Sequence, residues 1–207
     1  MLNFVPDDVT LEALGIRLDD ADAATLRLDA IPVARRIAHA RKKIVGLFPV
    51  SPDIGVTAMG VQLGLALAEV ANATVAYVDA NVRWPAISPA AIGTRPTDDE
   101  SMFATRWLHG SVALLVPTRV GQAGAGVPQL ARVIQHGAEL FAHVLVDLTG
   151  FKKLGEHLAA VEMMDGVVLV ARAGRTREDE LLHVHFDLPP HLNCGVLLLG
   201  ARLPKLP

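Results

Sequence analysis

Two aspartates stand at the ends of apolar segments, where their carboxylates could take part in chemistry. Asp79 closes the run at 74–79, and Asp147 closes the run at 143–147. Oxygen ligands of this kind hold Mg²⁺, directly or through water, and the hydroxyl of Thr57 could join them. A second interpretation remains open for all three. The carboxylates could accept hydrogen bonds from nearby loop N–H groups, and Thr57 could be an N-cap or first-turn residue of a helix.

The elements that must position these residues alternate along the chain. Apolar runs typical of buried strands are separated by segments with helical spacing, which predicts an α/β fold: a doubly wound, mainly parallel sheet with helices on both faces. In such sheets ligands bind beyond the carboxyl ends of the strands. We expect strands at 43–49, 74–79, 112–116, 143–147, 166–171 and 193–199, and helices at 21–41 (split at Pro32), 57–70, 101–109, 128–140, 153–163 and 176–186. Surface loops are expected at 86–100 and 120–126.

Composition limits the classes of protein that this chain can belong to. Its 207 residues, 51% of them hydrophobic, suffice for one domain, which we place at 21–207 after a loosely attached N-terminal arm at 1–20. The net charge of −3 without a dense basic run argues against nucleic-acid binding. Cys194, the single cysteine, is expected to be a buried thiol in a strand, and the scattered histidines predict no zinc site. The sequence shows neither a signal peptide nor a membrane span, so we expect a soluble, cytoplasmic protein.

Several short motifs, in order, resemble one known family. The second strand ends in Asp-Ala-Asn-Val-Arg-Trp-Pro (79–85), Asp147 ends a later strand, and residues 165–176 read Asp-Gly-Val-Val-Leu-Val-Ala-Arg-Ala-Gly-Arg-Thr. Over about residues 25–200 this pattern resembles the MinD/ParA-like class of P-loop ATPases, and most of all its bacterial tyrosine autokinase branch. The resemblance implies a P-loop NTPase-like fold and Asp147 as the Walker B aspartate. It also implies a role in polysaccharide synthesis and export or in positioning a cell-envelope machine.

The phosphate-binding loop departs from that family. Val56 stands where the family has the lysine that reaches the β- and γ-phosphates. Pro52 lacks an N–H group, and Asp53 brings negative charge to a site for a polyanion. Only Gly55 and Thr57 remain of the motif, and Asn81 replaces its second-strand aspartate. These departures predict a pseudo-ATPase without a nucleotide cofactor, in which Gly55, Thr57, Asp79 and Asp147 are relics of a cofactor site.

Two alternatives remain open. The chain could be a weakly active ATPase that binds ATP and Mg²⁺ with a basic residue from elsewhere, such as Lys42, Lys152, Lys153 or a partner's residue. It could also be a small-molecule-binding module of the doubly wound type. Autophosphorylation on tyrosine is not expected in any of these cases, because the single tyrosine, Tyr77, lies in a predicted buried strand.

Arg83 and Trp84 are candidates for a protein-binding site. Both follow the second predicted strand at the carboxyl edge of the sheet, and Trp and Arg are over-represented in binding hot spots. A packed turn is the alternative interpretation. The resemblance implies pairing across the nucleotide face, as a homodimer or a heterodimer with an active paralogue, or contact with an envelope-machine component. Such a partner could recruit the chain from the cytoplasm to the inner membrane.

Overall fold

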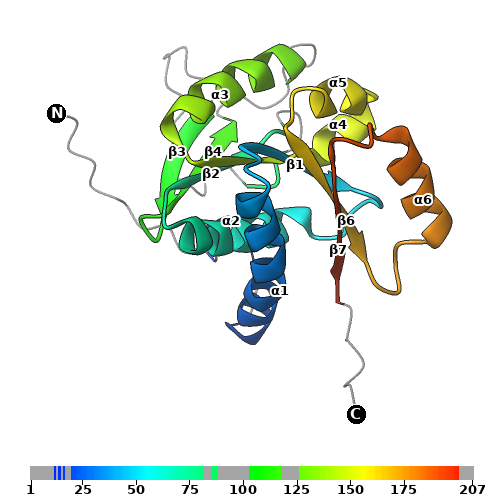
Figure 1. The fold of residues 1–207 in the computed structure, drawn as a ribbon, viewed down its shortest axis with the longest axis horizontal. Helices are drawn as coiled ribbons and strands as arrows, with labels where there is room; N and C mark the ends of the chain where they lie inside the picture. Colours follow the sequence, from blue (N-terminus) through cyan, green and yellow to red (C-terminus); the bar gives the residue numbers. More distant parts are fainter. Residues whose placement is uncertain are drawn as a thin grey trace.

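The fold is described from a computed structural model. The structure describes residues 20–81, 85–87, 103–117 and 126–200, together with residues 12, 14 and 16. A single sheet forms the centre of this part of the chain, and helices cover both of its faces (Figure 1).

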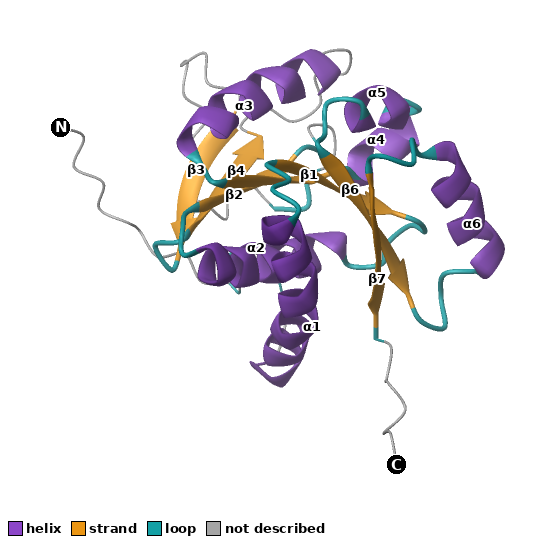
Figure 2. Cartoon of the chain, in the orientation of Figure 1, coloured by secondary structure: helices purple, strands orange, loops and turns teal. Residues whose placement is uncertain are grey.

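The sheet has seven strands in the order β3-β4-β2-β5-β1-β6-β7. Neighbouring strands run parallel except β3 and β4, which pair antiparallel at one edge. This arrangement confirms the predicted α/β fold with a mainly parallel sheet (Figure 2). The strands are β1 (Ile44–Pro49), β2 (Val75–Asp79), β3 (Phe103–Leu108), β4 (Val112–Pro117), β5 (His143–Asp147), β6 (Gly166–Arg172) and β7 (Asn193–Leu199).

Six helices belong to the described residues, and they form two layers. Buried side chains of the first two helices share one hydrophobic cluster with one face of the sheet, and those of the other four share a second cluster with the opposite face. The helices are α1 (Asp20–His39), α2 (Val56–Ala71), α3 (Gly126–Leu140), α4 (Thr149–Leu154), α5 (His157–Val161) and α6 (Glu178–Asp187).

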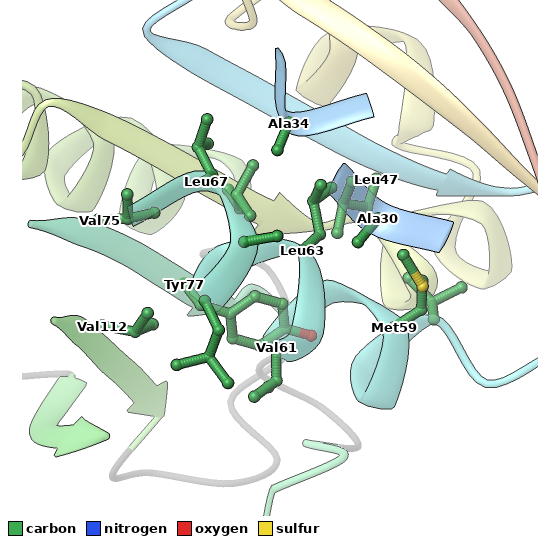
Figure 3. Packing of buried hydrophobic residues seen from close by; sticks show 14 of the residues in the cluster. Ala30, Ala34, Leu47, Met59, Val61, Leu63, Leu67, Val75, Tyr77 and Val112 are labelled. Atoms are coloured by element: carbon green, nitrogen blue, oxygen red, sulfur yellow. The ribbon is translucent and has the colours of Figure 1, made fainter. Parts of the chain in front are cut away.

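Helix α2 lies very close to the sheet because it carries a glycine where it crosses the strands. A Cβ atom on Gly60 would lie 2.8 Å from Cδ1 of Leu47 and closer still to the ring of Tyr77. Figure 3 shows the Tyr77 ring among aliphatic side chains such as Leu63 and Val61. The small residues of α2 therefore bring its first turn directly above the carboxyl ends of β1 and β2, where ligands bind in this type of sheet.

Some predicted elements differ from the structure. Residues 101–109 were expected to be helical, but Phe103–Leu108 is an edge strand. Its apolar residues recur at a spacing of four, which fits a helix as well as a half-buried strand. Pro32 lies inside α1 instead of splitting it. The ring sits on the exposed side, and the carbonyl that loses its N–H partner belongs to Leu28, an exposed residue that water can reach.

Two further expectations need correction. The helix predicted at 153–163 is divided into α4 and α5, because Gly155 adopts a left-handed conformation with φ of 71°. Of the N-terminal arm placed at 1–20, Leu14 and Ile16 belong to the described part, and both are buried in the cluster that contains side chains of α1 and α2. Cys194 lies in a strand as predicted, yet it is half-buried rather than buried.

Several predictions fall on residues outside the described part. These are the pair Arg83 and Trp84, almost all of the loop at 86–100, and residues 120–125. Among the residues that the structure does describe, no helix combines the length and the apolar character needed to cross a bilayer.

Candidate functional site

The loop between β1 and α2 occupies the position of a phosphate-binding loop. It turns sharply, with left-handed conformations at Asp53 (φ 51°) and Gly55 (φ 88°). Neighbouring elements hold it in place. The hydroxyl of Ser51 donates to Oε2 of Glu180 at 2.8 Å, and Arg175 Nη1 donates to the carbonyl of Asp53 at 3.0 Å. These two bonds tie the loop to the β6–α6 connection and to the first turn of α6.

Val56, at the position of the family's lysine, is the first residue of α2 and belongs to the hydrophobic core. Only 4% of its surface is exposed, and Ile54, two residues earlier, is buried in the same cluster. By contrast, Pro52, Asp53 and Gly55 are exposed. The loop therefore turns apolar side chains inward and presents a proline ring and a carboxylate to solvent.

Asp147 ends β5 and is saturated with hydrogen bonds from its own chain. Its Oδ2 accepts from the hydroxyl of Thr57 at 2.9 Å and from the hydroxyl of Tyr77 at 2.8 Å. Its Oδ1 accepts from both the backbone N–H and the hydroxyl of Thr149. Four donors therefore surround this carboxylate, which is the number that its two oxygens can accept with good geometry.

Asp79 ends the neighbouring strand β2 and is equally buried. Its Oδ1 accepts from the N–H of Asn81 at 3.1 Å, and its Oδ2 from the N–H of Ile87 at 3.0 Å. Burial, followed by the negative charge of Asp147, raises the pKa of Asp79 to about 7. These two causes outweigh the backbone N–H groups, which lower the pKa. Near neutral pH this carboxyl group is therefore only partly ionised.

Asn81 and Gly150 pack against each other beside the carboxyl end of β5. A Cβ atom on Gly150 would lie 2.5 Å from Oδ1 of Asn81, so the amide packs directly against the backbone of the glycine. Asn81 is itself buried. Asn81, which replaces the family's second aspartate, thus packs tightly between the turn that follows β2 and the turn that follows β5.

Among the described residues, the cationic side chains near the loop come from the side of β6 and α6. A Cβ atom on Gly55 would lie 3.7 Å from Nη2 of Arg172, so this guanidinium group lies at the mouth of the loop. Lys42 cannot reach that place, because it precedes β1 and its Nζ donates to the carbonyl of Asp165 at the opposite end of the sheet. The side chains of Lys152 and Lys153 are outside the description.

The structure brings together three of the predicted relic residues. Thr57 and Asp147 are in direct contact, and Asp79 stands opposite Asp147 in the register of β2 and β5. Gly55 lies on the other side of the loop, beneath Arg172. The described residues contain no group of three His, Cys, Asp or Glu side chains arranged for a metal ion.

Sequence reasoning missed two contributors to the site. Tyr77 was expected to be buried, which is confirmed, but its hydrogen bond to Asp147 was not foreseen. The signal was available, because Tyr77 precedes Asp79 by two residues and so shares its face of the strand. Arg172 is the second, because the motif at 165–176 contains it but no role was assigned to it, and its position near Gly55 comes from the packing of the two segments.

Comparison with known proteins gives matches among solved structures alone. No protein-family profile and no curated protein matches the chain. The kinase domain of VpsO superposes with a TM-score of 0.69 at 18% identity, covering 90% of this chain and 98% of that one. The kinase domain of the Escherichia coli tyrosine kinase ETK gives 0.69 at 13% identity, covering 96% and 84%. A Borrelia burgdorferi plasmid partition protein gives 0.51 at 13% identity, covering 80% of each chain. The chain therefore has the P-loop-type α/β fold of bacterial tyrosine kinase domains, which confirms the predicted resemblance at the level of the fold.

Proposed function

We propose that this chain is a pseudo-ATPase, a P-loop-type fold that does not turn over ATP and acts by binding other proteins. The observation that carries the proposal is the burial of Val56 in the core at the position where the family has its lysine. Without that ammonium group, the loop has no cation of its own to neutralise the β- and γ-phosphates. A buried apolar side chain cannot supply this charge in any rotamer.

The charges around the loop support the same conclusion. Asp53 is exposed on the loop, and Glu180 lies behind it, bound to Ser51. Both carboxylates would stand near a polyphosphate and repel it. Pro52 removes one of the N–H groups that a phosphate-binding loop directs at its ligand. Arg172 offsets part of this repulsion, but it is an exposed side chain.

The residues that would hold Mg²⁺ form hydrogen bonds with one another. Thr57 donates its hydroxyl to Asp147, and Tyr77 and Thr149 donate to the same carboxylate. A magnesium ion at this place would have to displace donors from a buried carboxylate whose oxygens are already satisfied. The site therefore fits a closed structural network better than it fits a metal-bound nucleotide.

The cellular setting is proposed from the resemblance to tyrosine autokinases. It suggests polysaccharide synthesis or export, or the positioning of a cell-envelope machine. Partners would be a second copy, an active paralogue or a component of that machine. The chain would then act in the cytoplasm and reach the inner membrane through its partner. We propose Arg83 and Trp84 as anchors of this contact, since an indole ring and a guanidinium fork suit interface centres.

A second candidate function is favoured by the position of Arg172. Its guanidinium group lies over Gly55, where it could contact a phosphate in place of the missing lysine. The chain would then be a weakly active ATPase of the MinD/ParA-like type, with ATP and Mg²⁺ as cofactors. Of the lysines first considered for this role, Lys42 is excluded within the same chain by its location at the other end of the sheet.

Phosphate release from MgATP separates the two functions. The leading proposal predicts no turnover by the purified wild-type chain above a protein-free control, and no change in the Arg172→Gln variant. Turnover by the wild type that Arg172→Gln abolishes would establish the second function instead. Arg177→Gln is the matched control, because Arg177 is an exposed arginine of the same turn that pairs with Asp179.

A further inference from the structure

A groove lies at the end of the sheet opposite to the loop. It has a volume of about 730 Å³ and is bounded by the last turns of α1 and α6 and by the beginning of β7. Strand β7 is the edge of the sheet, and α1 and α6 flank it (Figure 1). Nothing in the proposed pseudo-ATPase function uses this place, so the groove requires an explanation of its own.

A bulge in β7 shapes the wall of the groove. Val167 is opposite Asn193 and Leu169 is opposite Val196, so β7 contains one more residue than β6 over this stretch. The extra residue is accommodated at Gly195, which has φ of 109°. Oδ1 of Asn193 accepts a hydrogen bond from the N–H of Gly195 at 2.8 Å and so fixes the bulge. Bulges of this kind redirect side chains near functional sites.

The floor of the groove is formed where Gly166 begins β6. A Cβ atom at Gly166 would clash with Sγ of Cys194 and would lie 3.5 Å from Cδ of Lys42. The thiol and the aliphatic part of the lysine therefore lie side by side over this glycine. A Cβ atom at Gly195 would lie 3.2 Å from Nη1 of Arg36, which places the guanidinium group against the residue that follows Cys194.

The groove carries uncompensated positive charge. Arg36 and Lys42 both line it, and neither forms an ion pair with a carboxylate of the described residues. The ammonium group of Lys42 donates to the carbonyl of Asp165 at 2.6 Å, a contact that leaves its charge unpaired. Among the described residues that line the groove there is no Asp or Glu. The two cations would therefore attract an anion to the vicinity of Cys194.

The remaining walls are mostly apolar, with His185 and Asn193 as their polar members. They are contributed by α1, by β6 and β7, and by the end of α6, where the side chain of Phe186 is 78% exposed. The ring extends the apolar surface of the groove. The apolar side chains of the lining are those of Val33, Ile37, Ala40, Val168, Phe186, Leu188, Pro190 and Val196.

We propose that this groove binds a small amphipathic anion, a molecule with an apolar body and one carboxylate or phosphate group. The volume lies in the range of small-molecule sites, which are mostly apolar with a few polar groups that fix orientation. Arg36, supported by Lys42, binds the anionic group, because a guanidinium fork matches the oxygens of both carboxylates and phosphates. The apolar body lies along Val33 and Val168 and beneath Phe186.

The single cysteine provides a direct test, because Cys194 lines the groove together with both cations. The rate of Cys194 alkylation by iodoacetamide is measured by mass spectrometry with increasing decanoate or decyl phosphate. We expect about tenfold protection at a ligand concentration ten times the Kd. Acetate, which lacks the body, and decanol, which lacks the charge, should give none at the same concentrations. The two amphiphiles compared with each other identify the anionic group that the groove prefers.

Matched variants make the test specific. Arg36→Gln should raise the Kd for the protecting amphiphile about tenfold or more. Arg35→Gln should leave the Kd unchanged, since Arg35 is an exposed neighbour on the same helix that does not line the groove. Should Arg36→Gln fail to fold, Phe186→Ser changes an exposed ring and should weaken binding without loss of stability.

Three results would overturn the proposal. The first is that neither amphiphile protects Cys194 at about 1 mM, a concentration that corresponds to weak affinity. The second is that decanol protects Cys194 equally well. The third is that Arg36→Gln and Arg35→Gln change the Kd equally. A fourth outcome assigns the groove differently. If Cys194 becomes protected as the protein concentration rises without ligand, and sedimentation shows a dimer, the groove is a contact between two copies. None of these results depends on the state of the nucleotide loop.

Discussion

Asp79 and Asp147 face each other as register partners at the ends of the adjacent strands β2 and β5. Both are fully buried, and the described contacts of each are to hydroxyl groups and backbone amides rather than to a cation. Two buried carboxyl groups so close together disfavour simultaneous ionisation. The arrangement therefore links the stability of the fold to pH through Asp79.

The pH dependence of stability follows from the pKa of Asp79. The carboxyl group titrates near 3.8 in the unfolded chain and at about 7 in the folded protein. Between these values the folded protein holds a proton that the unfolded chain has released, so stability falls as pH rises from about 4 to 7. The difference between the two pKa values corresponds to about 4 kcal/mol at most. Asp79→Asn cannot ionise, so its unfolding free energy relative to that of the wild type should be clearly higher at pH 8 than at pH 4.

Asp165→Asn is the control for this comparison. Asp165 also accepts two backbone N–H groups, those of Lys43 and Ile44, but it is exposed and distant from Asp147. Chemical denaturation at pH 4 and pH 8 measures both variants. If the advantage of Asp79→Asn over the wild type is the same at the two pH values, the proposed coupling of the two carboxyl groups is wrong.

The hydroxyl of Tyr77 should be important for stability. It donates to Asp147 at 2.8 Å in a fully buried position, so Tyr77→Phe leaves a buried carboxylate with one donor fewer. A hydrogen bond to a charged group of this kind is worth about 1.5 to 3 kcal/mol. Urea denaturation should show a loss of that size. An unchanged or higher stability would mean that the hydroxyl has another role than to satisfy Asp147.

Introducing a lysine at position 56 should not restore the family's loop. Val56 packs in the core, and Val56→Lys would bury an unpaired ammonium group, which destabilises a fold by about 3 kcal/mol or more. Val56→Met lengthens the side chain without a charge and should be tolerated better, at a cost of about 1 to 3 kcal/mol. Thermal unfolding compares the two variants. A fully stable Val56→Lys protein that binds MgATP would show that this position faces a usable phosphate site.

Arg83 and Trp84 are predicted to anchor a protein partner. Replacing both with Ala should weaken self-association or binding to the partner by about 2 kcal/mol or more, roughly thirtyfold in affinity. Sedimentation or a pull-down with a co-expressed partner measures this, and the thermal midpoint should stay nearly unchanged. A large drop in that midpoint would place the pair in the core, and unchanged association would move the partner surface elsewhere, with the loop at 86–100 as the next candidate.

The fold was largely predictable because parallel strands buried on both faces appear in the sequence as short apolar runs. All six of the expected strands, such as those ending at Asp79 and Asp147, lie within a residue of their observed bounds. The edge strand β3 was not predictable in this way. Most of its side chains are only half-buried, and the spacing of Phe103 and Trp107 fits one face of a helix equally well.

The residues of the candidate site could be predicted from the sequence, but the contacts among them could not. Asp79, Asp147 and Thr57 were found because each stands at the end of a strand or the beginning of a helix, positions that the sequence marks clearly. That Val56 belongs to the core depends on how α2 packs, and that Arg172 covers Gly55 depends on a turn far away in the sequence. Such contacts between distant segments have no local signal.

The loop at 50–56 is proposed to bind no nucleotide. Isothermal titration of the wild-type chain with ATP and with ADP, each with Mg²⁺, measures this binding. Because the lysine is replaced by a buried valine and Asp53 adds negative charge, we expect no binding tighter than about 1 mM. The same result is expected for Asp53→Gly, which removes the charge but does not supply a lysine. Micromolar binding of MgATP by the wild type, lost in Arg172→Gln, would contradict the account and show an ATPase site rebuilt around Arg172.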